Sequence, residues 1–333
     1  MRLDAPASGE GALIARIAQR VGQASLPQPF HLLHGIGDDT AVLQAGDQTL
    51  LWTADMLVEG VHFRVDWIDP ASLGWKSLAV NLSDIAAMGG EPVGALLSVA
   101  LPAEHTGAWL DALIEGLVSC AQTYGVALLG GDTNRAERVV IDVSVLGVVA
   151  GQPVLRSGAQ AGDWLLVSGA LGGSCAGLHA LMAGNASAVD LAPHFRPTPR
   201  LQVGMFAREL GATAMMDLSD GLAADLPKLL RASAVGAVID AAQVPVHPAA
   251  AHWAQAHGLD PVAFAIAGGE DYELLLAAPP RIAQQLLERV PARTGVLLTK
   301  IGEVIAAQEV WLQHSDGRRE SLASAAGWDH FRA

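Results

Sequence analysis

Acidic side chains recur beside glycines at six separate points of the chain. They stand in the stretches "GIGDD", "TADMLVEG", "NLSDIAAMGG", "GGDT", "DLSDG" and "GGED". A solvated surface acid needs no neighbouring glycine, whereas glycine lets the backbone approach a ligand closely. Ligand sets made of oxygen suit hard cations such as Mg²⁺, which bridge carboxylates to the phosphates of a substrate. The pattern indicates a chain that holds several divalent cations with carboxylates.

Each motif taken singly also has a reading without a ligand. Asp38 and Asp39 are good turn formers, and "GGDT" can be a plain turn. Ser219 or Asp220 can cap the helix that follows "DLSDG", and His62 can be a packed core histidine. These alternatives stay open for each motif, but six such motifs in one chain favour a shared site.

Asp84 lies near the end of a predicted helix, "DPASLGWKSLAVNLSDIAAMGG", which has Pro near its start and Gly-Gly after its end. Its helical spacing places four residues on one face: Ser77, Asn81, Asp84 and Met88. Leu78, Leu82 and Ile85 form a second, core-facing side. We expect Asp84 on a partly polar face where a ligand can bind. The alternative, an exposed acid in the last turn, opposes the helix dipole and is left open.

Composition limits the partners of the chain. Its 333 residues carry 20 Lys+Arg against 34 Asp+Glu, a formal charge of −14. This balance argues against a nucleic-acid partner, which would need a basic stripe. The first residues lack the apolar core of a signal peptide. The uncharged stretch 164–189 contains several glycines and predicts a strand, a turn and a helix, not a membrane span. We expect a soluble cytoplasmic protein with no membrane partner.

The order of predicted elements indicates a layered α/β fold (α/β, α+β layered) with two domains. Strands are predicted over 49–56 and 58–65, ahead of the helix that carries Asp84, and strands alternate with helices through the second half. A polar, glycine-bearing segment near 150–162 marks the boundary. We therefore divide the chain into domains 1–150 and 151–333.

Common nucleotide-binding and catalytic signatures are missing from the sequence. There is no G-x-x-x-x-G-K-[ST] loop, no H-E-x-x-H and no G-x-S-x-G. A P-loop is therefore excluded, and the sequence offers no obvious pair of nucleophile and general base.

Taken together, the motifs resemble the thiamine-monophosphate kinase family, in the superfamily of aminoimidazole ribonucleotide synthetase. The matching stretches are "GIGDDTAVL", "TADMLVEGVHF", "AVNLSDIAAMGGEP", "LLGGDT", "VLRSGAQAGD", "DLSDGLAADL", "GGEDYELL" and "GWDHF". They run in order over nearly the whole chain. The resemblance implies a homodimer of two-domain subunits with the aminoimidazole ribonucleotide synthetase-like fold. The N-terminal sheet, in the ATP- and Mg²⁺-binding domain, pairs across the dimer, and a C-terminal α/β domain completes the active site.

The resemblance also implies an activity: phosphorylation of thiamine monophosphate to thiamine diphosphate with ATP and several Mg²⁺ ions per site. By motif, the metal ligands are Asp39, Thr53, Ala54, Asp55, Asp84, Asp132, Asp217 and Asp220. The ATP-binding positions are Gly131, Asp132, Arg156 and Ser219, and the substrate-binding positions are His62, Glu270 and Trp328. Ala54 departs from many relatives, which have a hydroxyl residue there, so a metal contact at this position would come from its backbone carbonyl.

The implied substrates also suggest a mechanism. The second pKa of a phosphomonoester is about 6, so the acceptor is largely dianionic at neutral pH and needs no general base. We expect direct in-line transfer through positioning and charge neutralisation, with no covalent intermediate and no catalytic nucleophile. Trp328 would stack on a substrate ring. Glu270 would either accept hydrogen bonds from the aminopyrimidine or balance the thiazolium cation.

Two other functions remain open from the sequence. One is a related ATP-dependent synthetase such as aminoimidazole ribonucleotide synthetase, which "GGEDYELL" and "GWDHF" fit less well. The other is a non-catalytic protein that binds divalent cations, which would explain the carboxylates without the ATP and substrate positions. Nucleotide turnover separates the enzymes from such a protein.

Overall fold

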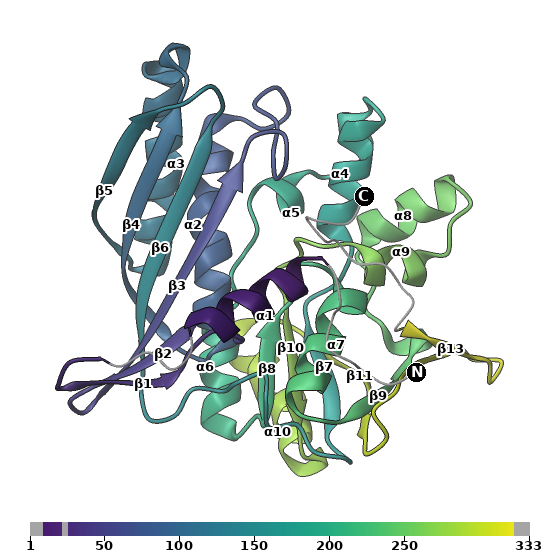
Figure 1. Cartoon of the computed structure of the whole chain (residues 1–333). Helices are drawn as coiled ribbons and strands as arrows, with labels where there is room; N and C mark the ends of the chain where they lie inside the picture. Colours follow the sequence, from purple (N-terminus) through teal and green to yellow (C-terminus); the bar gives the residue numbers. More distant parts are fainter. Residues whose placement is uncertain (1–8, 22–25, 323–333) are drawn as a thin grey trace.

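The protein consists of two lobes, each built on a β-sheet (Figure 1). The computed structural model describes residues 9–21 and 26–322. Trp328, which the sequence places in the substrate site, lies outside these residues. No helix in the described part is long and apolar enough to cross a membrane.

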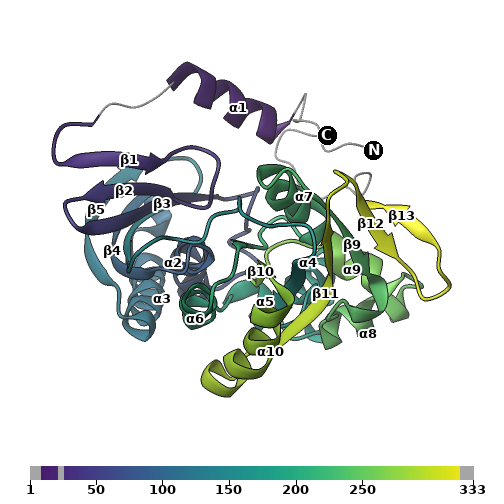
Figure 2. The same ribbon diagram turned by 90° about the horizontal axis from the view of Figure 1, so that it is seen from below.

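The first lobe contains a six-stranded sheet in the order β1-β2-β3-β6-β4-β5. Its strands are β1 (Phe30–His34), β2 (Ala41–Ala45), β3 (Gln48–Val58), β4 (Glu91–Leu101), β5 (Ala127–Arg135) and β6 (Val140–Val149). Neighbouring strands are antiparallel except for β4 and β5, which are parallel. Two helices, α2 (Pro70–Ala87) and α3 (Ala108–Tyr124), cover one face of this sheet (Figure 2). A short 3₁₀ turn, η1 (Ala103–His105), precedes α3.

Alternation along the strands explains why only one face of this sheet is covered. In β6, Ile141, Val143 and Val145 are buried and their neighbours are not, as expected for side chains that point to opposite faces in turn. The opposite face is apolar but exposed: Trp52 of β3 is 52% exposed and Leu129 of β5 is 63% exposed. The amphipathic helix α1 (Glu10–Val21) has no buried residue and lies on the outside of the molecule (Figure 2).

The second lobe contains a seven-stranded sheet in the order β13-β12-β9-β11-β7-β10-β8. Its strands are β7 (Trp164–Ser168), β8 (Ala214–Asp217), β9 (Gly236–Asp240), β10 (Leu274–Ala278), β11 (Leu298–Ile305), β12 (Val310–Gln313) and β13 (Arg319–Ser321). Its helices are α4 (Gly173–Met182), α5 (Ala192–Phe195), α6 (Leu201–Leu210), α7 (Leu222–Ala232), α8 (Pro248–Ala256), α9 (Pro261–Ala267) and α10 (Pro280–Thr294), with 3₁₀ turns η2 (Ala186–Ala188) and η3 (Ala241–Gln243). Strand β8, at one edge of this sheet, and its neighbour β10 are buried along their whole length.

One hydrophobic core runs from the first lobe into the second. It includes Leu82 of α2, Phe206 of α6 and Met215 of β8. Gly204 of α6 lies so close to α2 that a Cβ there would stand 1.9 Å from the carbonyl oxygen of Ala86. The helix that carries Asp84 is therefore fixed against both sheets.

The predicted strand over 58–65 is wrong, because β3 ends at Val58 and the chain then turns. Gly60 has a φ of +81°, and its N–H donates to the carbonyl of Phe63 at 2.8 Å. A positive φ is available to glycine but interrupts a strand. The short strands β1, β2 and β13 and the helices α5 and α9 were not predicted from the sequence.

Substitution of Gly116 tests the packing of α3 on α2. A Cβ at Gly116 would lie 1.8 Å from the carbonyl oxygen of Ala71. Although alanine is the better helix former, we expect Gly116→Ala to lower the free energy of unfolding by about 1–3 kcal/mol because of overpacking. Gly107→Ala is the control, since nothing lies within 4 Å of its Cβ position. Denaturant unfolding measures both; equal stability of the two variants would contradict the close approach of the helices.

Candidate functional site

Three carboxylates from distant parts of the chain meet between the two lobes. Asp39 follows β1, Asp84 lies near the end of α2, and Asp217 ends β8. One oxygen atom from each lies within 4.8 Å of the others. The sequence predicted all three as metal ligands, and the structure brings them together.

Hydrogen bonds from α2 and β3 fix the orientation of these carboxylates. Thr53 Oγ1 donates to Asp84 Oδ2 at 2.5 Å, and Ser83 Oγ donates to Asp217 Oδ2 at 2.7 Å. Asn81 Oδ1 accepts the backbone N–H of Asp55 at 3.0 Å, which ties β3 to the helix. The face of α2 that bears Asn81 is polar as predicted, but Asn81 is completely buried.

The carboxylates destabilise one another's charged forms. Burial, and then the charges of Asp55, Asp217 and Asp39, raise the pKa of Asp84 well above its ordinary value. The pKa of Asp217 is also raised well above that value, first by burial and then by Asp39. Burial raises the pKa of Asp55 to about 6, and Asp142 is the next largest cause. Such a group is stable in its ionised form only when positive charge stands among its members.

The donor set fits a hard divalent cation. Within the described residues, Asp39 Oδ2 is buried and has no hydrogen-bond partner, and an unpaired buried carboxylate oxygen is costly. Its other oxygen, Oδ1, accepts from Arg156 Nη2. Carboxylate and hydroxyl oxygens are the ligands that Mg²⁺ and Ca²⁺ prefer. The orphaned oxygen of Asp39 therefore points to a cation position beside Asp84 and Asp217.

The adjacent residues Asp38 and Asp39 make different contacts. Asp38 Oδ2 accepts the backbone N–H of Arg156 at 3.0 Å, and Asp38 Oδ1 accepts that of Asp39. Burial, and then Asp39, raise the pKa of Asp38 to about 6, while Arg156 opposes the shift. Asp38 thus anchors the segment between the lobes, and Asp39 is left to face Asp84 and Asp217.

Gly131 and Asp132 lie away from these carboxylates, on the exposed edge strand β5. Asp132 pairs in register with Ser98 of β4. Two strands separate β5 from β3, so Asp132 lies about 14 Å from β3 at the usual strand spacing. A Cβ at Gly131 would stand 1.6 Å from the carbonyl oxygen of Leu97, so only glycine fits at this position.

Asp220 and Ser219 lie on the loop after β8. Asp220 forms an ion pair with Lys228 Nζ at 2.6 Å, and the same lysine contacts the buried Asp225 at 2.8 Å. Sequence reasoning missed Lys228, although its spacing to Asp225 and Asp220 on a predicted helix gave a signal. The carbonyl of Ser219 accepts the backbone N–H of Glu270 at 2.7 Å, which joins this loop to the "GGED" segment.

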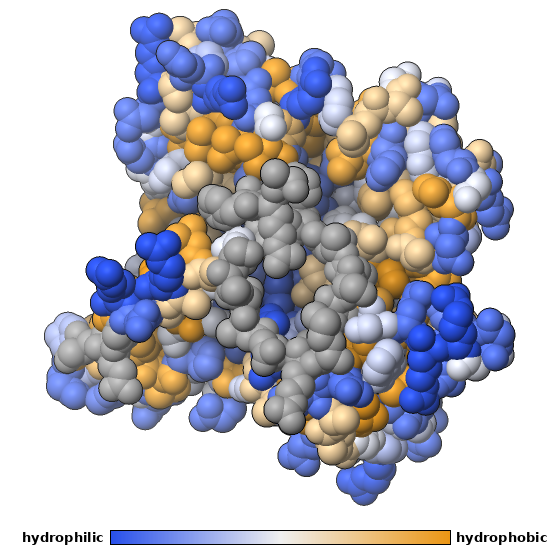
Figure 3. Space-filling view, turned by 45° about the vertical axis from the view of Figure 1, so that its right-hand side comes forward, coloured by the Kyte–Doolittle hydropathy of each residue, from blue (hydrophilic) through white to orange (hydrophobic). Residues whose placement is uncertain are grey.

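Two further predicted positions, Ala54 and His62, lie within β3 and in the turn after it. Ala54 is exposed, and its side chain lies on the face of the sheet opposite to Thr53 and Asp55. His62 lies in the turn after β3, where its Nδ1 accepts the backbone N–H of Val58 at 3.0 Å. In a space-filling view, Figure 3 shows a hollow with hydrophilic (blue) surface inside it.

Two family models match the chain. Residues 37–149 match "AIR synthase related protein, N-terminal domain", and residues 160–315 match "AIR synthase related protein, C-terminal domain". The two matches correspond to the two sheets of the structure.

Curated relatives and solved structures agree with these matches. Thiamine-monophosphate kinase of Escherichia coli K12 is 39% identical over 98% of this chain and 99% of the relative. That of Synechococcus elongatus is 39% identical over 93% and 95%. The structure of "AaThiL complexed with AMPPCP and TMP" is 32% identical, covers 97% of each chain and superimposes with a TM-score of 0.83. The enzyme from Stenotrophomonas maltophilia is 37% identical over 95% and 97%, with a TM-score of 0.74. With this identity over nearly its full length, the chain belongs to the thiamine-monophosphate kinase family.

Proposed function

We propose that the protein transfers the γ-phosphoryl group of ATP to thiamine monophosphate and so forms thiamine diphosphate. The observation that carries this proposal is the convergence of Asp39, Asp84 and Asp217 on one point, with a buried oxygen of Asp39 left without a partner. The names of the relatives and the AMPPCP and TMP in the related structure support it. Because the reaction consumes ATP, we also propose a cytoplasmic location.

Several Mg²⁺ ions would supply the positive charge that both phosphates require. We assign them to Asp39, Thr53, Asp55, Asp84 and Asp217, with the backbone of Ala54, and with Asp220 and Asp132 at the periphery. These residues would hold the ions, and the bound ions would neutralise the charge of the phosphates. The acceptor phosphate is already dianionic, so the residues need only align donor and acceptor. Transfer is therefore direct, without a covalent intermediate.

Arg156 is proposed to contact a phosphate of ATP. Its Nη2 binds Asp39, whereas its Nε has no hydrogen-bond partner within the described residues. A guanidinium group held on one side by a carboxylate presents its remaining N–H groups in a fixed direction, which suits a phosphate. Gly131 and Ser219 are assigned to the same nucleotide, and His62, Glu270 and Trp328 to thiamine monophosphate.

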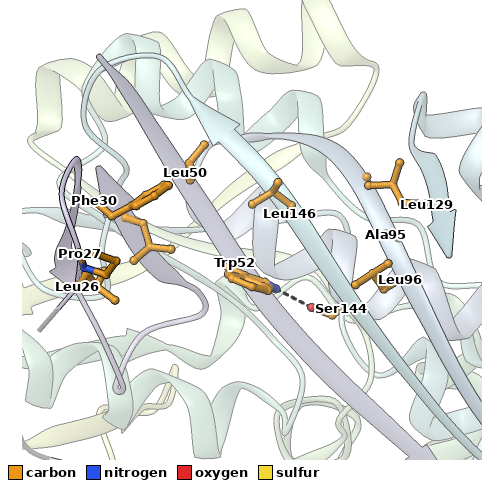
Figure 4. A pocket seen from close by; sticks show the side chains of 12 residues that line it. Leu26, Pro27, Phe30, Leu50, Trp52, Ala95, Leu96, Leu129, Ser144 and Leu146 are labelled. Carbon is orange, nitrogen blue, oxygen red and sulfur yellow. Dashed lines mark hydrogen bonds between the residues drawn. The ribbon is translucent and has the colours of Figure 1, made fainter. Parts of the chain in front are cut away.

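A homodimer would cover the exposed apolar face of the first sheet. Trp52, Leu96, Leu129 and Leu146 lie along this face (Figure 4). The indole N–H of Trp52 donates to Ser144 Oγ at 2.7 Å, so the face presents no unpaired indole donor to a partner. Large exposed apolar patches mark protein interfaces. We therefore assign residues 1–150 to nucleotide binding and dimerisation, and residues 151–333 to completion of the active site.

The first prediction concerns the reaction itself. Purified protein with MgATP and thiamine monophosphate should give thiamine diphosphate and ADP in equal amounts, measured by chromatography. Asp217→Asn should lower kcat by ~10²-fold or more, because it removes a carboxylate from the charge-neutralising set. Cation binding without ATP consumption would indicate the non-catalytic alternative, and a phosphoenzyme trapped from radiolabelled ATP would contradict direct transfer.

The second prediction concerns the metal-free protein. Asp55 has a folded-state pKa of about 6 against an ordinary 3.8, so its stabilising contribution is present below pH ~4 and is lost as pH rises through about 6. Calorimetric unfolding without metal should therefore show stability falling over this range. At neutral pH, Mg²⁺ at 100 times its Kd should raise the free energy of unfolding by about 2.7 kcal/mol.

The variant Asp84→Asn sharpens this test. It removes one of the repelling charges, so the metal-free variant should be more stable than the wild type at neutral pH while Mg²⁺ stabilises it less. Asp111→Asn, at an exposed position of α3, is the matched control and should change neither quantity. Identical Mg²⁺ stabilisation of all three proteins would contradict the proposed metal site.

The third prediction concerns assembly. Leu129→Glu places a charge on the exposed apolar face and should shift the protein from dimer to monomer in light scattering after gel filtration. Leu297→Glu is the control, because Leu297 is at least as exposed as Leu129, at 68%, but belongs to the second lobe. A wild-type monomer at micromolar concentration, or a dimer that Leu129→Glu leaves intact, would count against this interface.

A further inference from the structure

A buried lysine lies behind the carboxylate of Glu270. Lys76, on α2 of the first lobe, is 1% exposed, and its Nζ lies 2.9 Å from Glu270 Oε1. The side chain of Glu270, from the second lobe, is 24% exposed. A ligand can therefore reach Glu270 but not Lys76.

The second oxygen of Glu270 is held as well. His194 Nδ1 lies 3.3 Å from Glu270 Oε2, and Ser174 Oγ lies 2.9 Å from the same nitrogen. Burial, and then the charge of Lys76, lower the pKa of His194, which keeps its ring neutral. A neutral imidazole with its proton on Nδ1 donates to the carboxylate without adding charge. The Glu270 carboxylate thus has one partner for each oxygen.

The backbone around Glu270 is also fixed in an unusual form. Glu270 has a φ of +63°, which non-glycine residues rarely adopt. Its N–H donates to the carbonyl of Ser219, and a Cβ on the preceding Gly269 would lie 2.6 Å from the same oxygen. Such strained positions persist where the surroundings determine them fully, and they gather at ligand-binding sites.

Helix α2 sets the distance from Glu270 to the carboxylate cluster. Lys76 and Asp84 are eight residues apart on this helix, which corresponds to about 12 Å along its axis. A substrate whose phosphate binds at the metal ions would thus extend its ring systems toward Glu270.

We propose that Lys76 and His194 are positioning residues that hold Glu270 as a charge-compensated hydrogen-bond acceptor for the amino group of the substrate's pyrimidine. This inference rests on the proposed function and decides between the two roles that the sequence left open for Glu270. In this role the carboxylate accepts a hydrogen bond from an N–H group and does not balance the charge of the thiazolium cation.

Charge and geometry support this choice. Lys76 and Glu270 together carry no net charge, so a cation that approaches the carboxylate is repelled by the ammonium group behind it. A hydrogen bond from an N–H group needs only a lone pair that points in a fixed direction. Each oxygen of the Glu270 carboxylate still has a free lone pair after it has bound Lys76 or His194. The lysine also lowers the pKa of Glu270 to about 2 against the effect of burial, so the carboxylate accepts hydrogen bonds at every physiological pH.

The test compares three substrates in steady-state kinetics and in calorimetric binding. They are thiamine monophosphate, oxythiamine monophosphate, in which oxygen replaces the amino group, and deazathiamine monophosphate, in which a neutral thiophene replaces the thiazolium. The wild type should prefer the amino compound to the oxygen analogue by about 10-fold or more in kcat/KM. Lys76→Met should abolish most of this preference, leave the ratio of thiamine to deazathiamine compound unchanged, and leave the KM for ATP within about twofold.

Arg200→Met is the matched control. Arg200 forms another largely buried ion pair of the second lobe, in which its Nε donates to Glu273 Oε2 at 2.7 Å, whereas the ion-pair partners of Glu270 are Lys76 and His194. It should lose stability as Lys76→Met does but keep the preference for the amino group. If the unpaired Glu270 prevents Lys76→Met from folding, the double variant Lys76→Met/Glu270→Gln removes both charges at once and provides a folded protein. This double variant should also lose the preference for the amino compound.

The outcomes separate this inference from the proposed function. If the wild type converts thiamine monophosphate but Lys76→Met and Arg200→Met change substrate preference equally, Lys76 is merely structural and the inference falls alone. If Lys76→Met changes only the ratio of kcat/KM for the thiamine compound to that for the deazathiamine compound, Glu270 balances the charge of the thiazolium. That result would also overturn the inference. If the wild type neither binds nor converts thiamine monophosphate, the proposed function fails and this inference fails with it.

Discussion

The structure depends on a cluster of carboxylates that repel one another. Asp39, Asp84 and Asp217 are brought within 4.8 Å in surroundings that raise the pKa of the latter two well above its ordinary value. Nothing local to these residues favours that arrangement. It is maintained by the apolar core that continues from one lobe to the other and by hydrogen bonds from Thr53 and Ser83. A divalent cation turns this repulsion into binding energy, which is why a site with this geometry suits two anionic substrates.

Helix α2 joins the two halves of the proposed site. Asp84 lies near its end, where β3 and β8 contribute Thr53 and Asp217. Lys76 lies two turns earlier and contacts Glu270 of the second lobe. Both groups therefore move with one rigid element, which packs against the core of each lobe. A helix built in this way fixes the separation between the phosphate end and the ring end of a substrate, and no flexible loop has to supply that distance.

Much of the site was predictable because glycine and aspartate at strand or helix ends have few common uses. Asp39, Asp84 and Asp217 were predicted and lie together. The backbone N–H of Asp55 donates to Asn81, which is on the same helix as Asp84. Asp132 is on an exposed edge strand and Asp220 is paired with Lys228, so their roles stay predictions. Lys76, Ser83 and His194 were missed, because a lysine or serine within a helical pattern looks the same whether it faces solvent or a buried carboxylate.

The sequence by itself determined the order of most strands and helices, the turns that require glycine and the oxygen-rich chemistry of the site. It did so because propensity, periodicity and positive φ depend on near neighbours along the chain. Tertiary structure alone decided which acids meet, which basic group neutralises each of them, and that 58–65 forms a turn in place of a strand. Those outcomes depend on packing and on Coulomb forces that act through space. They involve residues that are far apart in the sequence, so no local sequence pattern predicts them.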